Sequence, residues 1–163
     1  MTVRFLRNKV VEVESQKGGA LRVSYRLTDD LLKLEVNLVV MPPDLEIVEA
    51  NAKADRLPSK AFEKASSLIE KIEGVNIGPG LRKIVKGLLS EKGESPLLAD
   101  AVLECCNSVI LHFTRPGIEI GETVEDPEEK LALTRAMVQS NPRLVRSCIA
   151  FQDDSPIMKG LNL

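Results

Sequence analysis

LRVSYRLT, residues 21–28 of the chain, alternates apolar and polar side chains residue by residue. A period of two is typical of a β-strand with one buried face. A second alternating stretch covers 32–40 and ends at the prolines of Met41–Asp44, because proline cannot donate to a strand ladder. The polar residues Thr28, Asp29 and Asp30 between them predict a turn. We therefore expect two neighbouring antiparallel strands.

Two further strands flank this pair. Residues 2–14 predict one strand, and Lys17, Gly18 and Gly19 predict the turn that follows it. Residues 48–55 alternate again and predict the other strand. Its expected apolar face is mostly alanine, which would let a helix lie close to the sheet; the residues are Val48, Ala50, Ala52 and Ala54.

From Pro58 onward the period changes from two to 3.6, which predicts helices. Ser59 can cap a helix with Phe62, Ala65, Ile69 and Ile72 on one face, ended by Gly74. The next predicted helix carries Leu81, Ile84, Val85, Leu88 and Leu89 on one stripe and ends at Gly93. Ser95-Pro96 then combines an N-cap with proline at the first helical position. We expect that third helix to end before Arg115-Pro116-Gly117.

An acidic connection is expected over 116–126, and Asp126-Pro127 predicts the start of a fourth helix. Asn141-Pro142 predicts a last short helix with Leu144, Val145, Cys148 and Ile149. The predicted fold is α+β: an antiparallel meander of three to four strands followed by about five helices packed on one face. We expect a single domain over 1–163, with the meander in 1–57, a helical layer in 58–115, and C-terminal helices and tail in 127–163.

The composition excludes several classes of function. The 163 residues include no Trp, one Tyr, four Phe and a single histidine, His112. Sites with several histidine ligands are therefore impossible, and a row of aromatic side chains that stacks on nucleic-acid bases cannot be built. The 22 basic and 24 acidic residues nearly cancel, which argues against a polyanion binder. We expect no nucleic-acid partner.

The cysteines and the N-terminal residues indicate a compartment. Charged residues interrupt the first nine positions, so no signal peptide is expected there. No apolar run approaches the about 20 residues of a membrane span. Three cysteines are an odd number, and the neighbours Cys105 and Cys106 are poor disulfide partners. We predict a reduced, cytoplasmic protein without a membrane partner.

A glycine-containing loop precedes the helix that begins near Leu81. Gly78 and Gly80 come directly before it, and Arg82 and Lys83 lie in its first turn. Free backbone N–H groups and the helix dipole could there bind a small anionic ligand, such as a phosphate or carboxylate. The glycine spacing matches neither a Walker loop nor a dinucleotide fingerprint. The alternative, which the ordinary use of glycine favours, is a tight interhelical turn.

Glu104, Cys105, Cys106 and His112 are expected on one helix. Cys105 and His112 are seven residues apart and share a face, so a soft metal ion or an imidazole-activated thiol is conceivable. Two helical turns span about 10 Å, too far for direct contact between the two side chains. We favour core cysteines beside a partly buried histidine, and we expect neither a metal nor a cofactor. The acidic clusters at 29–30, 125–129 and 153–154 lack calcium-loop spacing and are assigned to turns and helix caps.

Residues 21–160 resemble a bacterial family that is known only as a domain of unknown function. The matching segments are Asp29–Leu34, the alanine-rich strand that runs to Pro58, Gly74–Gly80, the helix after Ser95-Pro96, and Pro142–Phe151. The most specific are Ile77-Gly78-Pro79-Gly80 and the segment around Cys148.

The chain departs from that family where the family carries histidine, cysteine and tryptophan. The family pattern has His-Asp-Met-Trp at 29–32, Gly-Cys-Thr-His-Leu at 94–98 and Cys-His-Ala-Trp at 148–151, and this chain lacks most of these residues. No catalytic residue is therefore carried over. A fainter likeness to the iron–sulfur cluster scaffold fold is of the fold only, because the cluster cysteines expected near Pro58 and Ser95 are absent.

The sequence thus predicts a non-catalytic binding module for a small anionic ligand or a protein partner. Its site would lie between the sheet and the loop over 74–83. One alternative is a degenerate relative of a thiol- or metal-dependent enzyme, or of an iron–sulfur scaffold, with Cys105, Cys148 and His112 as residual site residues. The other alternative is a structural subunit of a homo- or hetero-oligomer that pairs through exposed strand edges.

Overall fold

The computed structural model of the chain describes residues 4–55, 65–90 and 95–161. The chain divides into two compact units, Met1–Val109 and Ile110–Leu163, and each is described by itself. The first unit contains a four-stranded antiparallel sheet, and helices follow it along the chain. The predicted α+β class is confirmed.

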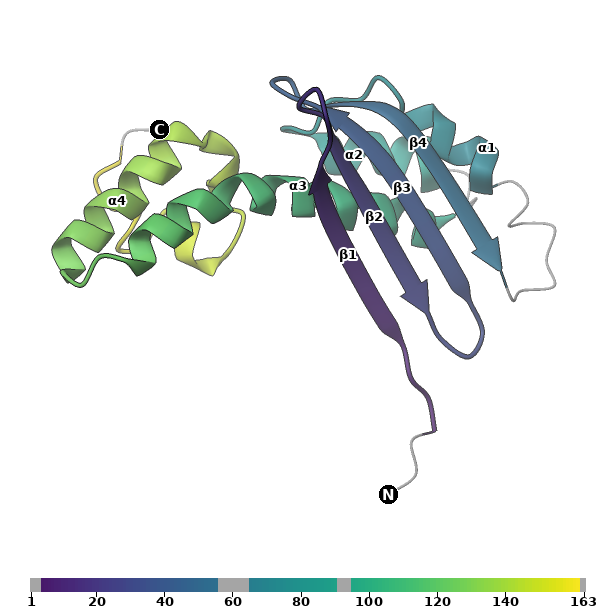
Figure 1. The fold of residues 1–163 in the computed structure, drawn as a ribbon, viewed down its shortest axis with the longest axis horizontal. Helices are drawn as coiled ribbons and strands as arrows, with labels where there is room; N and C mark the ends of the chain where they lie inside the picture. The colour runs from purple at the N-terminus through teal and green to yellow at the C-terminus, as the bar shows by residue number, and fades with distance from the viewer. Residues whose placement is uncertain (1–3, 56–64, 91–94, 162–163) are drawn as a thin grey trace. The chain divides into compact units, whose positions relative to one another are not determined.

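The sheet is the predicted meander (Figure 1). Its strands lie in chain order, and each pairs antiparallel with the next. Their bounds are β1 (Asn8–Ser15), β2 (Leu21–Thr28), β3 (Lys33–Met41) and β4 (Glu46–Asp55). β1 and β4 are therefore the two edge strands.

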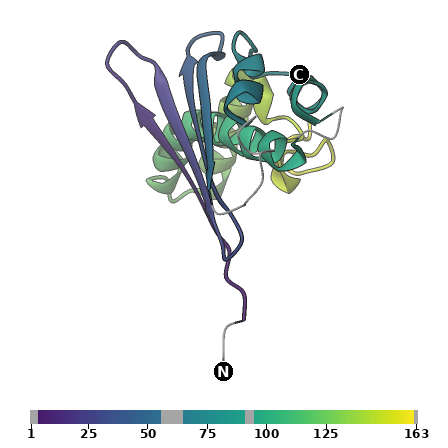
Figure 2. The same cartoon turned by 90° about the vertical axis from the view of Figure 1, so that its right-hand side faces the viewer.

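One face of the sheet forms the core of the first unit. The alternate residues of β2 and β3 on that face are almost fully buried, as the period of two predicts. Figures 1 and 2 show the helices of this unit on one side of the sheet. They are α1 (Ala65–Ile69), α2 (Leu81–Ser90) and the part of α3 (Pro96–Glu122) up to Val109. The opposite face carries the polar set of residues and faces away from these helices.

β4 departs from the simple alternation that the sequence predicts. Val48 was expected on the apolar face with Ala50 and Ala52, but it is 42% exposed, whereas Ile47 is fully buried. The register explains the change: Val39 pairs with Glu49 and Val40 pairs with Ile47, so Val48 is the extra residue of a β-bulge. The bulge shifts the phase of the strand, and the alanines beyond it return to the buried face.

The helices of the first unit begin where the sequence predicts, as far as they are described. The start predicted at Ser59 lies outside the described residues; the described part of that segment is α1 and a 3₁₀ turn, η1 (Glu70–Ile72). α2 buries Leu81, Val85 and Leu89 at a spacing of four residues. The amide of Leu98 donates to the Ser95 hydroxyl at 3.3 Å, which confirms the cap of α3.

The predicted end of α3 before Arg115 is wrong, because the helix continues through Pro116 to Glu122. Proline removes one backbone donor from the helix, which is why the sequence predicts an end there. Arg115 Nε donates to Glu119 at 2.7 Å across the turn that contains Pro116. A Cβ on Gly117 would lie 2.6 Å from Met137 Sδ, so the absence of a side chain lets a second helix approach closely. The acidic connection therefore shrinks to 123–126.

α3 is also long and apolar enough, by length and composition, to cross a membrane. The sequence predicted the helix but not that it is long and apolar enough for a span. One such helix is weak evidence for a span, because the core helix of a soluble protein meets the same criteria. Its residues Leu98, Val102 and Cys105 belong to the core of the first unit.

The second unit is built around α4 (Pro127–Ser140). Its predicted start is confirmed, since Asp126 accepts a hydrogen bond from the Glu129 amide at 3.0 Å. Val138, Leu144 and Met158 form a small buried core. The last predicted helix is wrong: two 3₁₀ turns, η2 (Pro142–Leu144) and η3 (Ile149–Phe151), replace it, and Ile149 is 89% exposed. Its apolar residues thus do not share one buried face.

Candidate functional site

The loop before α2 is fixed to the beginning of β4 by backbone hydrogen bonds. The Gly74 amide donates to Ile47 O at 2.8 Å, and the Ile47 amide donates to Val75 O at 2.9 Å. The Ile77 amide donates to Leu45 O at 2.9 Å, and its side chain is fully buried. The loop therefore lies beside the sheet, as predicted, and backbone hydrogen bonds hold it there.

The first turn of α2 uses most of its own amides. Gly80 has φ +81°, and its carbonyl accepts from Lys83 and Ile84 at 2.9 and 3.2 Å, while the Leu81 amide donates to Gly78 O. The side chains of Arg82 and Lys83 are exposed. The cradle predicted at Gly78, Gly80, Arg82 and Lys83 thus consists of two exposed cationic side chains and the amides of Gly78, Gly80 and Arg82, which donate to no backbone carbonyl of the described residues. Anion binding there stays a prediction.

A thermal-shift experiment tests this anion site. If Arg82 and Lys83 bind an anion, phosphorylated or acyl-carboxylate compounds should raise the Tm of the wild-type chain by a few degrees. Each kcal/mol by which the bound ligand stabilises the folded state raises the Tm by roughly 4 °C. The double variant Arg82→Ala/Lys83→Ala should lose that shift. Lys9→Ala in β1 is the control and should keep it. No shift in the wild-type chain would count against the site.

The two neighbouring cysteines are core residues, as the sequence predicts. Cys105 and Cys106 are buried in the first unit. Burial raises the pKa of the Cys106 thiol to about 12 and raises the pKa of Cys105 still further. Both thiols are therefore protonated at neutral pH, and neither is a nucleophile or a ready metal ligand.

The remaining candidates for thiol or metal chemistry belong to the second unit. Cys148 is exposed, and half-buried His112 makes an edge-on ring contact with Phe113 at 5.6 Å between centroids. Among the residues that the structure describes, no group of three or more His, Cys, Asp or Glu is arranged to hold a metal ion. Cys105 is fully buried, and the ring contact of His112 with Phe113 is a packing contact.

Asp29 is a buried carboxylate with a structural role. Its Oδ1 accepts from the amides of Leu31 and Leu32 at 2.8 and 2.7 Å, and Arg7 Nε donates to its Oδ2 at 2.7 Å. Burial opposes ionisation, but the Leu31 amide, the Arg7 guanidinium and the Leu32 amide outweigh it and lower the pKa of Asp29. The predicted turn chemistry of this acidic residue is confirmed.

The lowered pKa of Asp29 predicts a pH dependence of stability. Below the ordinary carboxyl pKa of about 3.9 the unfolded chain binds a proton before the folded chain does. The stabilisation is therefore complete above that pH and is lost as the pH falls through the folded pKa. Asp29→Asn should flatten the fall of Tm between about pH 4 and pH 2, whereas Asp30→Asn, an exposed neighbour, should leave it steep. Equal slopes in all three proteins would contradict this role of Asp29.

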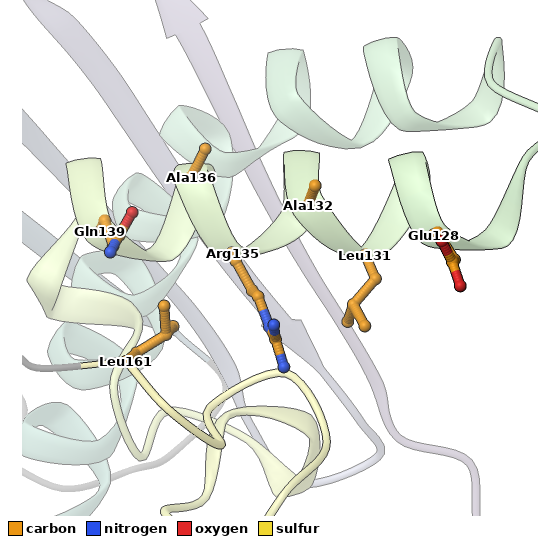
Figure 3. A pocket seen from close by; sticks show the side chains of 7 residues that line it. All are labelled: Glu128, Leu131, Ala132, Arg135, Ala136, Gln139 and Leu161. Atoms are coloured by element: carbon orange, nitrogen blue, oxygen red, sulfur yellow. The ribbon is translucent and has the colours of Figure 1, made fainter.

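A hollow of about 480 Å³ lies beside α4 in the second unit (Figure 3). Leu131, Ala136 and Leu161 give it an apolar lining, and Arg135 crosses it. The Arg135 guanidinium donates to the carbonyls of Ile157 at 3.1 Å, Pro156 at 2.9 Å and Lys159 at 3.1 Å. The arginine therefore fixes the C-terminal segment to α4, which is a structural task.

The uncovered face of the sheet is polar. Ser24 Oγ donates to Asn37 Oδ1 at 2.9 Å, and a shallow hollow of about 230 Å³ is lined there by residues that include Arg22, Asn37 and Glu49. Lys33 and Glu35 form an ion pair at 2.9 Å on the same face. Opposite charges are interspersed, so this face has no single-sign field that would attract one class of ligand.

The two edges of the sheet differ. At the outer edge of β4, the Ala50 amide donates to Glu73 Oε1 at 2.9 Å, and Leu45 and Ile47 are bonded to the loop at 75–77. At the outer edge of β1, no strand within the described part of the chain pairs with Asn8–Ser15 (Figure 1). The edge of β4 is thus closed over its first half, whereas no backbone hydrogen bond of the described residues closes the outer edge of β1.

The β1–β2 hairpin shows which backbone groups of β1 point outward. The Gln16 amide donates to Ala20 O at 2.8 Å, in the same register as β1 and β2. Facing residues of an antiparallel pair of strands alternate between hydrogen-bonded and non-hydrogen-bonded. Because Gln16 and Ala20 form a hydrogen-bonded pair, the backbone groups of Glu14 and Glu12 are directed at β2. The groups of the alternate residues, Lys9, Val11, Val13 and Ser15, point away from the sheet. The sequence predicted exposed strand edges without naming these residues.

Comparison with known proteins identifies no relative: no family model, curated protein or solved structure matches this chain. The resemblance to the bacterial family of unknown function therefore stays a prediction.

Proposed function

We propose that the chain is a non-catalytic protein-binding module that adds an extended segment to its sheet along the outer edge of β1. The observation that carries the proposal is the asymmetry of the edges. The backbone groups of β1 at positions 9, 11, 13 and 15 have no partner within the described residues, whereas Leu45, Ile47 and Ala50 at the β4 edge do.

β1 lacks two of the devices that protect an edge strand from another chain, although it carries the charged residues Lys9, Glu12 and Glu14. It contains no proline, and its eight pairs with β2 run without a bulge. The side chains of Val11 and Val13 lie on the helix-covered face but are only half-buried. An added strand would gain main-chain hydrogen bonds along the edge and would cover these valines, as in known cases of strand addition.

The described residues also support a binding role over a catalytic one. The buried thiols are protonated at neutral pH, and the buried carboxylate, Asp29, is occupied by two amides and Arg7. Neither group is both activated and accessible to a substrate.

Selection from a library of displayed peptides tests the proposal. Binders selected against the dilute wild-type chain should lose binding to Val11→Pro/Val13→Pro, because proline removes two outward amides and leaves the β1–β2 ladder intact. The same binders should retain their affinity for Arg82→Ala/Lys83→Ala. These two residues lie on α2, after the loop that is bonded to β4 at the other edge of the sheet. Binders that ignore the prolines, or a library without binders, would contradict strand addition at β1.

A further inference from the structure

The open edge of β1 is complementary to itself. On the premise of the proposed function, we propose that its occupant is a second copy of this chain. The two β1 strands pair antiparallel around a two-fold axis at Val11, and the two four-stranded sheets become one continuous sheet of the dimer.

The hydrogen-bonding phase of β1 restricts how two copies can pair. Each outward residue must lie opposite an outward residue of the second copy, so only registers that keep odd positions against odd positions are allowed. With Val11 opposite Val11, Lys9 lies opposite Val13 of the second copy, and the outward groups of both strands are directed at each other.

The length of β1 and its charges select among the allowed registers. Pairing centred on Val11 overlaps positions 8–14 of each strand, and pairing centred on Glu12 overlaps positions 9–15. The latter sets Glu12 directly opposite Glu12, and like charges in that position are destabilising. Centres closer to either end of the strand overlap fewer residues. The register centred on Val11 therefore combines full length with no like-charged residues directly opposite each other.

The side chains in this register are compatible on both faces of the sheet. On the helix-covered face, half-buried Val11 and Val13 of each copy form one apolar group of four valines across the axis. On the opposite face, Asn8 lies opposite Glu14 and can donate to its carboxylate. Pairing of the two strands thus buries apolar surface of Val11 and Val13 that is half-exposed in each copy.

The charge distribution along the strand favours the antiparallel direction. Lys9 lies near the beginning of the strand, and Glu12 and Glu14 make its end acidic; Arg7 is already bonded to Asp29, and Glu12 forms an ion pair with Arg26 at 2.9 Å. Antiparallel pairing sets Lys9 of one copy along the acidic part of the other, within the about 10 Å over which charges interact at 0.1 M salt. Parallel pairing would set each glutamate beside its own equivalent.

Sedimentation velocity of the full chain over a concentration series tests the dimer. The wild-type chain should pass from monomer to dimer as the concentration rises. Val11→Pro/Val13→Pro should raise the dimer Kd by about tenfold or more, whereas Val11→Thr/Val13→Thr, which keeps both amides, should weaken it less. Far-ultraviolet circular dichroism checks that each variant is folded. A wild-type chain that stays monomeric, or a dimer that the prolines do not weaken, overturns the inference.

Disulfide trapping tests the register without proline. In a Cys148→Ser background, Val11→Cys sets two thiols directly opposite at about 5.5 Å between Cα atoms, within disulfide range. Val10→Cys is the matched control, since its equivalent lies diagonally at about 7–8 Å, beyond that range. Mild oxidation should cross-link the first variant and not the second. Equal cross-linking of the two variants, or none in either, overturns the register.

These outcomes separate the dimer from the broader proposal. If the wild-type chain stays monomeric but its selected peptides fail to bind Val11→Pro/Val13→Pro, the dimer is refuted and strand addition at β1 still stands. Self-association that the prolines abolish, with peptides that compete against it, supports both.

Discussion

Val36→Asp is expected to unfold the first unit, whereas Val39→Asp is expected to be tolerated. Both positions lie on β3, but Val36 is fully buried on the helix-covered face and Val39 is half-buried on the polar face. An unpaired carboxylate at Val36 should cost about 4 kcal/mol or more, a large part of the stability of a domain. At Val39 the same change should cost about 1 kcal/mol or less, because water still reaches the side chain.

Urea denaturation followed by circular dichroism measures both variants. The expected result is a low or absent transition for Val36→Asp and a midpoint close to that of the wild-type chain for Val39→Asp. Similar losses at the two positions would mean that the sheet buries both faces, and would contradict the assignment of the polar face to solvent.

Ile77→Ala is expected to lower the free energy of unfolding by about 2–5 kcal/mol, the usual cost of truncating a buried isoleucine. Ile77 is fully buried, and its amide joins the loop to Leu45 at 2.9 Å. Ile84→Ala on α2 is the matched control: Ile84 is 45% exposed, and its loss should cost about 0.5 kcal/mol.

The same pair of variants tests how the β4 edge is closed. Loss of the Ile77 side chain should loosen the loop and speed hydrogen exchange of the Ile47 amide, which donates to Val75. The Ile84 variant should leave that exchange unchanged. If Ile77→Ala is as stable as Ile84→Ala, the loop does not close β4, and the contrast between the two sheet edges fails.

The meander was predictable because its signal is local. Residues 21–28 and 32–40 alternate without interruption, and a strand with one buried face needs nothing else to be recognised. The helix starts at Ser95-Pro96 and Asp126-Pro127 were predictable for the same reason, since each cap lies within a few residues of the amides that it binds. The fold class followed from these local patterns.

The errors in the fold arise where distant contacts override a local signal. The bulge at Val48 depends on the register with β3, which the strand's own sequence does not contain. Pro116 stays within α3 beside the Arg115–Glu119 pair and the close approach of Met137 to Gly117. Sequence rules weigh the proline alone and therefore end the helix too early.

The candidate site was predictable only in part. The sequence placed Gly78, Gly80, Arg82 and Lys83 at the beginning of a helix, but not the use of the Lys83 and Ile84 amides within the turn. Two things decide which backbone groups lie at the edge of β1: its position at one end of the sheet, and the hydrogen bond from Gln16 to Ala20, which fixes which residues of β1 are bonded to β2. Both are properties of the assembled sheet.

Residue-resolved amide hydrogen exchange of β1, measured by NMR at low and high protein concentration, tests the role of this edge most directly. We predict that the amides of Glu12 and Glu14 exchange slowly at every concentration, because they donate to β2. The amides of Val11 and Val13 should exchange fast in dilute solution and become protected as the concentration rises. Fast exchange of Val11 and Val13 at every concentration would contradict pairing with a second copy, and their protection in the dilute monomer would contradict an open edge.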